Sequence, residues 1–479
     1  MAELEPLSDA PSDDDTALAH AAQLARRFRR TLDSQAQCAT LNYAEMLERF
    51  AGELPAHGRP AVEVIDTLAT LAEPGLQKSA GSRFFGWVIG NSHEAGVAAD
   101  WLCSAWGQNA GNPLASPAAA ACEAVVVRWL LDLLGLPRQS GVGLVTGATM
   151  ANFVGIAAAR GALLARENWD VRAQGLAGSP PIRVLLGADA HATVDAALHY
   201  LGIGQASVVR IATDAQGAIL PDAFHEALHK QQGPTLAILQ AGQINTGAFD
   251  PFAELIPMAK ARNAWVHIDG AFGLWARCSP SLAPLAAGVE LADSWATDGH
   301  KWLQMPYDCG FAIVRDAKAQ VDAMGLSASY LPQADGERDP SHFVPELSRR
   351  ARGFAAWALL SHWGRDGVAR MVEQHVFLAQ MMARRLAQAP GVSVVNDVVL
   401  NQLIVRFGAG RPDEEADSLT LATIAKIQAR QACFAGGAKW RNRWVMRISV
   451  CSSATDEAAA TASVDAMLAA WREVQADAA

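Results

Sequence analysis

The chain has 479 residues, which is too long for one hydrophobic core and predicts two or three domains. Hydrophobic residues make up 51% of the chain and charged residues 18%, which indicates a soluble globular protein with a large buried interior. The net charge is −10 and no basic cluster offsets it, which argues against a nucleic-acid partner.

The cysteines and the apolar runs indicate the cellular compartment in which we expect the protein. Seven cysteines are scattered without a CxxC pair or metal-ligand spacing, which favours free thiols over disulfides or zinc. No apolar run reaches the ~20 residues of a membrane span. We therefore expect a cytoplasmic protein with no metal site and no membrane contact.

Residues 1–84 predict a helical N-terminal arm. The segment 1–13 is acidic and contains Pro and Ser, which indicates disorder rather than a signal peptide. Apolar residues at helical spacing run from Asp14 to Phe50. A connection broken by Pro and Gly follows, and then a short helical pattern over Val62–Ala72.

Residues 85–375 predict a large α/β domain. Helices are expected at Ala95–Trp106 and Ala118–Leu134. Short apolar runs then predict strands at Gly143–Val145, Ile182–Leu186, Ser207–Ile211, Thr235–Gln240 and Ala264–Asp269. Helical patterns alternate with them at Thr149–Arg160, Ala192–Leu201, Pro221–Lys230 and Phe252–Arg262. This alternation predicts a mostly parallel sheet covered on both faces, with ligands at the carboxyl ends of its strands.

Residues 376–479 predict a small α+β domain. Before it come a polar stretch at 326–347, of the kind that is usually functional or disordered, and a helix at Ala355–Ala387. In the small domain, strands are expected at Val392–Val395, Asn401–Phe407 and Trp444–Val450. Helices are expected at Leu419–Gln431 and Glu457–Val474. We find no internal repeat.

Two residues near predicted strand ends suggest cofactor chemistry. Lys301 is followed by apolar residues, which indicates a buried lysine, although most lysines lie on the surface. Asp269 ends an apolar strand before Gly270, where an ordinary turn cap is the alternative. A pyridoxal phosphate enzyme needs a lysine that forms a Schiff base and a carboxylate that keeps the ring nitrogen protonated. The two residues stand about one βαβ unit apart, so together they predict such a site.

Two further segments could complete the site. Thr146–Thr149 joins a strand to a helix, and small residues there expose N–H groups that suit a phosphate, although a simple Thr cap gives the same pattern. His191 lies between a strand and a helix, where a structural hydrogen bond is the usual role. A cofactor above Asp269 would allow this imidazole to stack on its ring.

Taken together, these segments resemble the group II pyridoxal-phosphate-dependent amino-acid decarboxylases, which include aromatic amino acid, histidine, glutamate and diaminobutyrate enzymes. The resemblance runs from about residue 80 to the C-terminus. It rests on Arg83–Val88, Ala115–Ala118, Thr146–Asn152, His191, Asn245–Asp250, His267–Ala271, Gly299–Trp302, Ser348–Arg352 and Met446–Val450, in the family's order. It implies an α/β fold of type I and a homodimer with active sites near the interface, across which Asp14–Phe50 would pack.

The resemblance also implies residue roles. Lys301 would carry the cofactor as a Schiff base, Asp269 would pair with its pyridine nitrogen, and His191 and Ala271 would pack on its two faces. The phosphate would be held by Ala148, Thr149, Ser294 and His300. The ring hydroxyl would be reached by Asn245 or Thr246, and the substrate pocket would be lined by Phe85 and Trp87.

Three departures from the family pattern stand out. Met150 replaces a common Glu, and Asp298 stands where some members have Asn, which suits a phosphate neighbour only if the side chain points away. Pro340 follows an Asp where relatives often place the Tyr thought to return the proton. We expect Tyr330, His342 or His191 to supply that proton instead. In related plant enzymes, loss of the Tyr accompanies a switch to aldehyde production with oxygen consumption.

The expected function is decarboxylation of an L-amino acid to its amine. The alternatives are oxidative deamination to an aldehyde, a carbon–carbon lyase of the same fold, and a non-catalytic relative. The substrate stays open: the aromatic wall suits an aromatic side chain or a small one, and no basic residue is clearly placed for glutamate.

Overall fold

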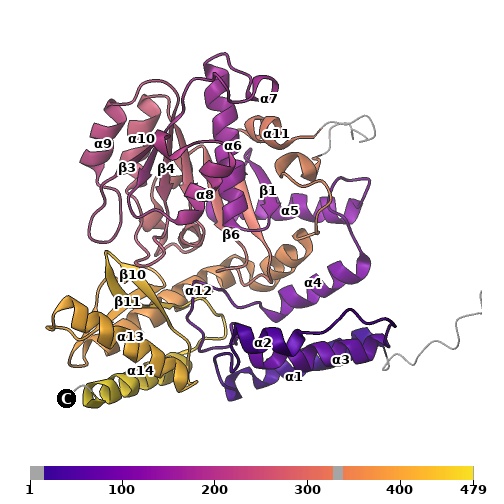
Figure 1. The fold of residues 1–479 in the computed structure, drawn as a ribbon. Helices are drawn as coiled ribbons and strands as arrows, with labels where there is room; N and C mark the ends of the chain where they lie inside the picture. Colours follow the sequence, from indigo (N-terminus) through magenta and orange to yellow (C-terminus); the bar gives the residue numbers. More distant parts are fainter. Residues whose placement is uncertain (1–15, 327–337, 478–479) are drawn as a thin grey trace, which may run out of the picture.

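The computed structural model describes residues 16–326 and 338–477 (Figure 1). The predicted disordered start and Tyr330 lie outside the described residues. The arm holds α1 (Ala17–Thr31), α2 (Tyr43–Phe50) and α3 (Ala61–Ala72). The helix predicted over Asp14–Phe50 is therefore two helices. The break precedes Asn42, which begins α2 anew by accepting hydrogen bonds from the N–H groups of Ala44 and Glu45.

Seven strands form the large sheet in the order β1-β7-β6-β5-β4-β2-β3. They are β1 (Gly141–Val145), β2 (Arg183–Gly187), β3 (Val208–Ile211), β4 (Thr235–Gln240), β5 (Trp265–Asp269), β6 (Ser294–Asp298) and β7 (Gly310–Val314). Only β7 runs against its neighbours β1 and β6. The predicted mostly parallel sheet is confirmed.

Helices cover both faces of this sheet because its strands are apolar on both sides. In β4, Leu236 and Ile238 pack toward one layer, and Ala237 and Leu239 pack toward the other. The first layer holds α6 (Ala148–Arg166), α7 (Val171–Gln174), α8 (Ala192–Tyr200) and α11 (Ala317–Met324). The second holds α5 (Pro117–Leu134), α9 (Pro221–His229), α10 (Phe252–Ala261) and the first half of α12 (Gly353–Ala387). The helix α4 (Glu94–Trp106) packs on α12.

The C-terminal sheet is antiparallel, in the order β10-β11-β9-β8. Its strands are β8 (Val392–Val394), β9 (Gln402–Phe407), β10 (Gly436–Trp440) and β11 (Arg443–Ser449), covered by α13 (Asp413–Ala429) and α14 (Glu457–Asp477). Helix α12 joins the two parts, since Leu359 lies in the large core and Leu378 in the small one. The boundary at residues 375/376 falls within this helix and stays a prediction.

Short 3-10 helices connect the larger elements. They are η2 (Leu32–Ser34), η3 (Glu73–Gly75), η4 (Gln205–Ser207), η5 (Gly273–Cys278), η6 (Ala283–Ala286), η7 (Val289–Leu291) and η8 (Pro340–Phe343). Among the described helices, α6 alone has the length and hydropathy of a membrane span, and 61% of that window is buried, as in a core helix.

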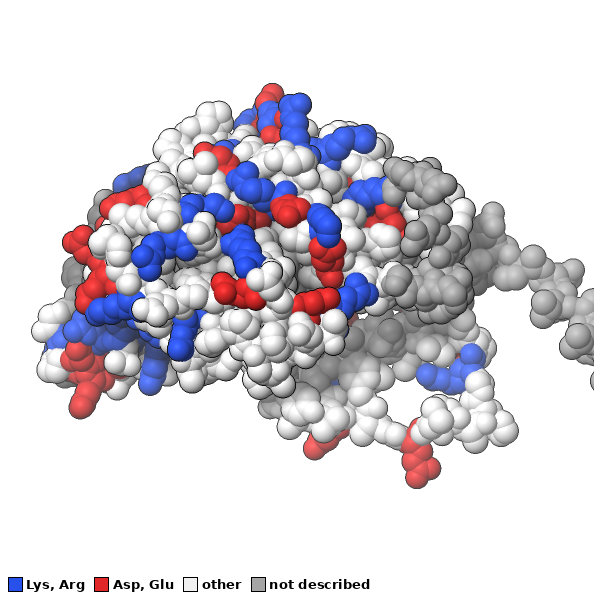
Figure 2. All heavy atoms as spheres, turned by 90° about the horizontal axis from the view of Figure 1, so that it is seen from above, with Lys and Arg blue, Asp and Glu red and all other residues white. Residues whose placement is uncertain are grey.

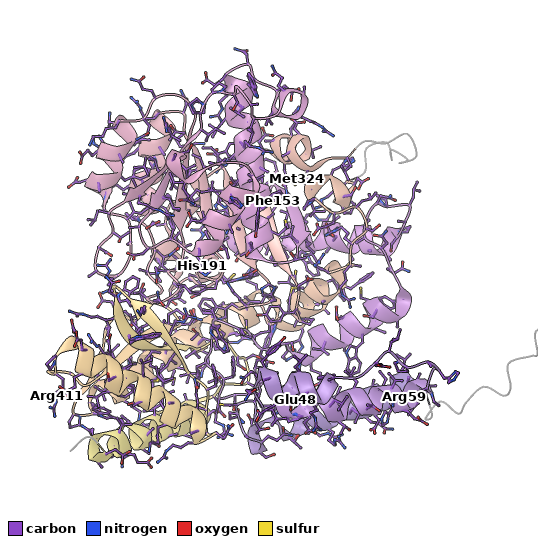
Figure 3. The ribbon with its side chains drawn as sticks, in the orientation of Figure 1. Glu48, Arg59, Phe153, His191, Met324 and Arg411 are labelled. Carbon is purple, nitrogen blue, oxygen red and sulfur yellow. The ribbon has the colours of Figure 1, made fainter. Side chains whose placement is uncertain are left out.

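Charge is mixed on the surface that Figure 2 shows. Over the described residues of that face, Lys and Arg lie among Asp and Glu without a broad patch of one sign. Figure 3 shows His191 at the edge of the large domain that faces the C-terminal sheet, with Glu48 and Arg59 on the arm. His191 therefore lies on the side of the large domain that faces the C-terminal sheet.

Candidate active site

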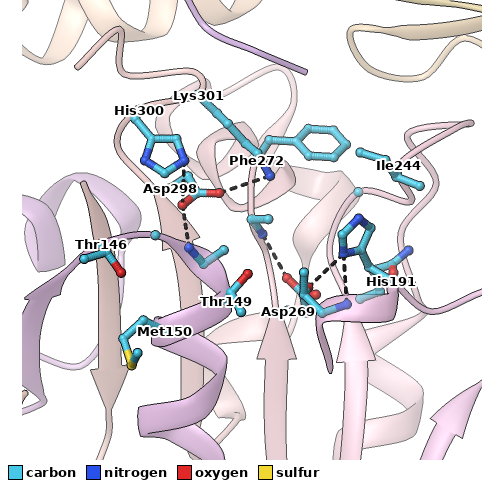
Figure 4. Close-up of a pocket in the computed structure, with 16 residues that line it drawn as sticks. Thr146, Thr149, Met150, His191, Ile244, Asp269, Phe272, Asp298, His300 and Lys301 are labelled. Atoms are coloured by element: carbon cyan, nitrogen blue, oxygen red, sulfur yellow. Dashed lines mark hydrogen bonds and ion pairs between the residues drawn. The ribbon is translucent and has the colours of Figure 1, made fainter. Parts of the chain in front are cut away.

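A cavity of about 300 Å³ opens at the carboxyl ends of the parallel strands (Figure 4). Its walls come from the loop into α6, the start of α8, the ends of β4, β5 and β6, and the segment after β6. The lining residues are Thr146, Gly147, Ala148, Thr149, Met150, His191, Thr193, Gln240, Gly242, Ile244, Asp269, Ala271, Phe272, Asp298, His300 and Lys301. Strand ends thus bring together residues from distant parts of the chain.

Lys301 reaches into the cavity from a rigid backbone. Its Nζ lies 3.0 Å from Asp298 Oδ2. A side chain at Gly90 would place its Cβ 1.7 Å from the carbonyl oxygen of Lys301, so only glycine allows this close approach. The next residue, Trp302, is fully buried and donates from Nε1 to His375 Nδ1 at 2.7 Å. These contacts fix the position of the lysine.

Asp269 and His191 face the cavity from two neighbouring elements. The Asp269 carboxylate is buried at the end of β5 and accepts a hydrogen bond from the N–H of Ala271 at 3.2 Å. Burial raises the pKa of Asp269, while the charges of His191 and Lys301 oppose the rise. His191 begins α8, where its Nδ1 lies 2.8 Å from Thr193 Oγ1. Burial lowers the pKa of His191, so its ring is favoured in the neutral form.

The wall nearest β6 is built around His300. The Nδ1 of His300 accepts a hydrogen bond from the N–H of Cys309 at 3.1 Å, and its ring stacks on Tyr307. This bond leaves Nε2 to face the cavity, 3.4 Å from Asp298 Oδ1. Burial lowers the pKa of His300. A side chain at Gly147 would come within 2.8 Å of the His300 ring, so the loop into α6 can lie here only with glycine.

The donor set fits pyridoxal phosphate. A primary amine, a buried carboxylate and a flat imidazole surround a cavity at the lower end of the range for small-molecule sites, about 300–1,000 Å³. The N-terminus of α6 supplies the positive end of a helix dipole, as a phosphate requires. Lys301 would hold the aldehyde carbon, and Asp269 the ring nitrogen.

Comparison with known proteins decides the family. The model of the pyridoxal-dependent decarboxylase conserved domain matches residues 44–407. The chain belongs to this family. It is a lyase that uses pyridoxal phosphate to decarboxylate an amino acid.

Individual relatives agree with this assignment. The decarboxylase is 26% identical over 413 residues to the aromatic-L-amino-acid decarboxylase of Bacillus atrophaeus, covering 85% of this chain and 83% of that protein. It is also 26% identical over 377 residues to the phenylacetaldehyde synthase of Arabidopsis thaliana, covering 75% of this chain and 76% of that protein. Its fold matches the crystal structure of Oryza sativa TDC with PLP and tryptamine, with a TM-score of 0.90, 22% identity, and coverage of 98% and 99%.

Seven of the predicted site residues line the cavity of the decarboxylase. They are Ala148, Thr149, His191, Asp269, Ala271, His300 and Lys301. The prediction for Ser294 is wrong. Ser294 opens β6 at its amino end, where its Oγ bonds to Trp265 Nε1 and His267 Nδ1 within the core. The cavity lies at the opposite end of that strand, where Asp298 lines it.

The two residues predicted to reach the ring hydroxyl do not line the cavity of this chain. Thr246 is turned away, because its Oγ1 donates to the carbonyl of Gln216 at 2.6 Å. Asn245 is buried, and its Oδ1 lies 3.5 Å from Arg447 Nη1. Neither residue lines the cavity.

The remaining predicted residues also lie outside the cavity of their own chain. Phe85 is buried in the core of the C-terminal sheet, which contradicts a place in the pocket wall. Trp87 is half-exposed and packs on Phe434. His342 sits on η8, which packs against α11 and β1, and its Nε2 is 3.9 Å from Asp339 Oδ2.

Several functional positions escaped the sequence interpretation. Gln240 ends β4, and Gly242 and Ile244 follow it, so the rule that ligands lie at strand ends identifies all three. Phe272 follows the Asp269 turn in the same way. Arg447 belongs to a segment used for the resemblance, and its positive charge lowers the pKa of His191, which indicates that it lies near the site.

Proposed function

We propose that the decarboxylase acts on an aromatic L-amino acid and forms the corresponding amine, with Lys301 as the residue that binds the cofactor. The observation that carries this is the meeting of Lys301, Asp269 and His191 in one cavity. The names of the relatives support an aromatic substrate. The apolar side chains of Phe272 and Ile244 on the wall support it further.

Bound pyridoxal phosphate supplies a ring that accepts the electrons of the bond to the departing carboxylate. The protein's own residues hold that ring. Lys301 would hold the cofactor at its aldehyde carbon, Asp269 would hold the ring nitrogen in its protonated form, and His191 would pack on one ring face. The N–H groups at the start of α6 bind the phosphate. The buried setting of Asp269 keeps water from competing for the ring nitrogen.

His191 is the residue we propose to return a proton to the carbon that loses the carboxylate. It lines the cavity, whereas His342 does not. Tyr330 lies outside the described residues. The Nδ1 of His191 is engaged with Thr193, so Nε2 is the atom that would carry the proton. Because burial favours the neutral ring, His191 would donate only after Nε2 has itself taken up a proton.

Aldehyde formation is the second candidate. Two observations favour it: Pro340 occupies the place of the family's Tyr, and phenylacetaldehyde synthase is among the relatives. A carbon–carbon lyase and a non-catalytic relative have no comparable support.

Product analysis separates these possibilities. The purified enzyme is incubated with each standard amino acid, diaminobutyrate and dihydroxyphenylalanine, and products are identified by mass spectrometry. We expect carbon dioxide and an amine from an aromatic member of the panel. An aldehyde with oxygen consumption would replace the amine assignment, and no product from any member would contradict the function.

We also propose a homodimer in a reducing, cytoplasmic compartment. The helices α1, α2 and α3 bury none of their residues within the chain. Apolar side chains on the arm are exposed, among them Leu18 at 75%, Tyr43 at 82% and Leu54 at 95%. An apolar surface of this kind marks a protein interface. All seven cysteines are free thiols, which supports the compartment.

A further inference from the structure

Asp298 does not point away from the phosphate position. Its carboxylate ends β6 and is almost fully buried, with 2% of the side chain exposed. It lies among three positive or proton-donating groups (Figure 4). Oδ1 accepts from the N–H of Ala148 at 2.5 Å and lies 3.4 Å from His300 Nε2, while Oδ2 pairs with Lys301 at 3.0 Å.

Ala148 is the first residue of α6. No side chain at the start of this helix caps its N-terminus. Gly147 precedes it and has no side chain to accept a hydrogen bond. The first turn of α6 contains no acidic residue. Asp298 therefore supplies from across the sheet the negative charge that a helix N-terminus attracts.

A phosphate bound at the same helix would bring a second anion to this position. Two anions a few ångströms apart repel each other strongly in a buried site. The N–H of Ala148 cannot donate a full hydrogen bond to the Asp298 carboxylate and to the phosphate at once. Binding of the phosphate thus requires the Asp298 carboxylate to withdraw from α6.

We propose that Asp298 is a positioning residue that stands in for the cofactor phosphate. In the cofactor-free enzyme its carboxylate occupies the anion position at α6 and holds Lys301 beside it. Phosphate displaces this carboxylate, so Asp298 lowers the affinity for the phosphorylated cofactor. The inference rests on the proposed phosphate site. It adds Asp298 as a residue that sets how tightly the cofactor binds there.

The test compares two ligands on three proteins. Cofactor-free wild type, Asp298→Asn and Asp316→Asn are titrated with pyridoxal 5′-phosphate and with pyridoxal, and the absorbance of bound ligand gives each affinity. Asp316 is the matched control, since it caps α11 outside the cavity by accepting from the N–H of Lys318. Pyridoxal carries the aldehyde without the phosphate, so it reports on Lys301 alone.

We expect Asp298→Asn to bind pyridoxal 5′-phosphate on the order of tenfold or more tightly than wild type, because one buried negative charge is removed. Its affinity for pyridoxal changes less, because pyridoxal senses only the lost ion pair with Lys301 and has no phosphate to repel. Asp316→Asn matches wild type for both ligands. Inorganic phosphate should also raise the melting temperature of Asp298→Asn more than that of wild type.

Equal gains for both ligands, or no gain for pyridoxal 5′-phosphate, would overturn the proposal. If Asp298→Asn does not fold, Asp298→Ser gives the same comparison with an uncharged hydroxyl. Failure of wild type to bind pyridoxal 5′-phosphate at all would count against the proposed function instead. The two failures are therefore distinguishable.

Discussion

Burial sets the ionisation of the cavity residues more than any neighbouring charge does. It lowers the pKa of His191 and of His300, and it raises the pKa of Asp269. Neighbouring charges then act on His191 in opposite directions, since Asp269 raises its pKa and Lys301 lowers it. A neutral imidazole is the form best suited to pack on an aromatic ring in a dry site.

Replacing His191 with Phe tests its proposed role as proton donor. The change keeps a flat ring but removes the proton, so amine formation should fall about 10²–10⁴-fold while the cofactor still binds. His199→Phe, an exposed position on the same helix, is the control and should behave like wild type. His342→Phe should also change little. A larger loss in His342→Phe than in His191→Phe would contradict the assignment.

Residue identities were partly predictable from the sequence. Asp269 is predictable because it ends an apolar run, His191 because it lies between a predicted strand and a helix, and Lys301 because apolar residues follow it. Apolar runs of this kind end at the ligand edge of a parallel sheet. Ser294 was misplaced because a motif gives order along the chain and does not tell which end of a strand a residue occupies. The contact of Asp298 with α6 joins residues far apart in sequence, so no local pattern reveals it.

At the scale of elements, one histidine ties the site to the core. His267 lies fully buried in β5, with its Nε2 2.9 Å from Asn152 Oδ1 on α6 and its Nδ1 2.7 Å from Ser294 Oγ on β6. Gly155 leaves room for the ring, since a Cβ there would lie 2.6 Å from it. The helix whose N-terminus lines the cavity is thereby held to the strand that ends at Asp269.

This buried histidine makes stability depend on pH. Burial lowers the pKa of His267 to about 3, whereas an unfolded histidine titrates near 6.5. Below pH 6.5 the unfolded chain takes up a proton that the folded chain does not, so stability falls as pH falls. Through this proton uptake, His267 lowers the free energy of unfolding by about 3 kcal/mol as the pH falls from 6.5 to 4.

Replacing His267 with Gln should remove that contribution. The variant is expected to lose about 1–3 kcal/mol at pH 7.5, because a buried hydrogen-bond network is disturbed. Its stability should then decline less than that of wild type as the pH falls from 6.5 to 4. Urea unfolding at several pH values measures both quantities. Parallel pH dependence in the two proteins would contradict the account.

Most strands of the two sheets were predictable from the sequence. Those that were missed lack the apolar pattern or the flanking helices that mark a strand. β4 and β5 are apolar runs between helices, so periodicity identifies them. The sequence interpretation misses β6, because Ser294, Thr297 and Asp298 interrupt its apolar residues. It also misses β7, which follows β6 without a crossover helix because the two strands are antiparallel. β10 begins with two glycines at the edge of its sheet and lacks the apolar pattern.

At the scale of the molecule, the arm exposes apolar side chains, and this exposure supports the proposed dimer. The arm meets the C-terminal part through residues outside its helices. The N–H of Gln37 donates to the carbonyl of Gln431, the N–H of Cys38 donates to the Gln431 side chain, and Cys38 and Phe84 pack with Phe434. On α2, Leu47 is 56% exposed. Burying such side chains against a second copy would gain about 1.5–3 kcal/mol for each one fully covered.

Replacing Leu47 with Asp should therefore weaken the dimer by about tenfold or more, because a charge would enter the interface. Leu421→Asp is the control, since Leu421 is exposed on α13 at 40%. Sedimentation over a range of protein concentrations measures the equilibrium. A chain shortened to begin near residue 52 that stays dimeric and equally stable would contradict a role of the arm in dimerisation.

The central claim is that Lys301 is the residue that binds pyridoxal phosphate. The most direct test loads the enzyme with cofactor, reduces it with borohydride and maps the attached pyridoxyl group by mass spectrometry. We predict that the pyridoxyl group is found on Lys301. In Lys301→Ala, both the attached group and the decarboxylase activity should be lost. A pyridoxyl group on another buried lysine such as Lys78, or on none, would contradict the account.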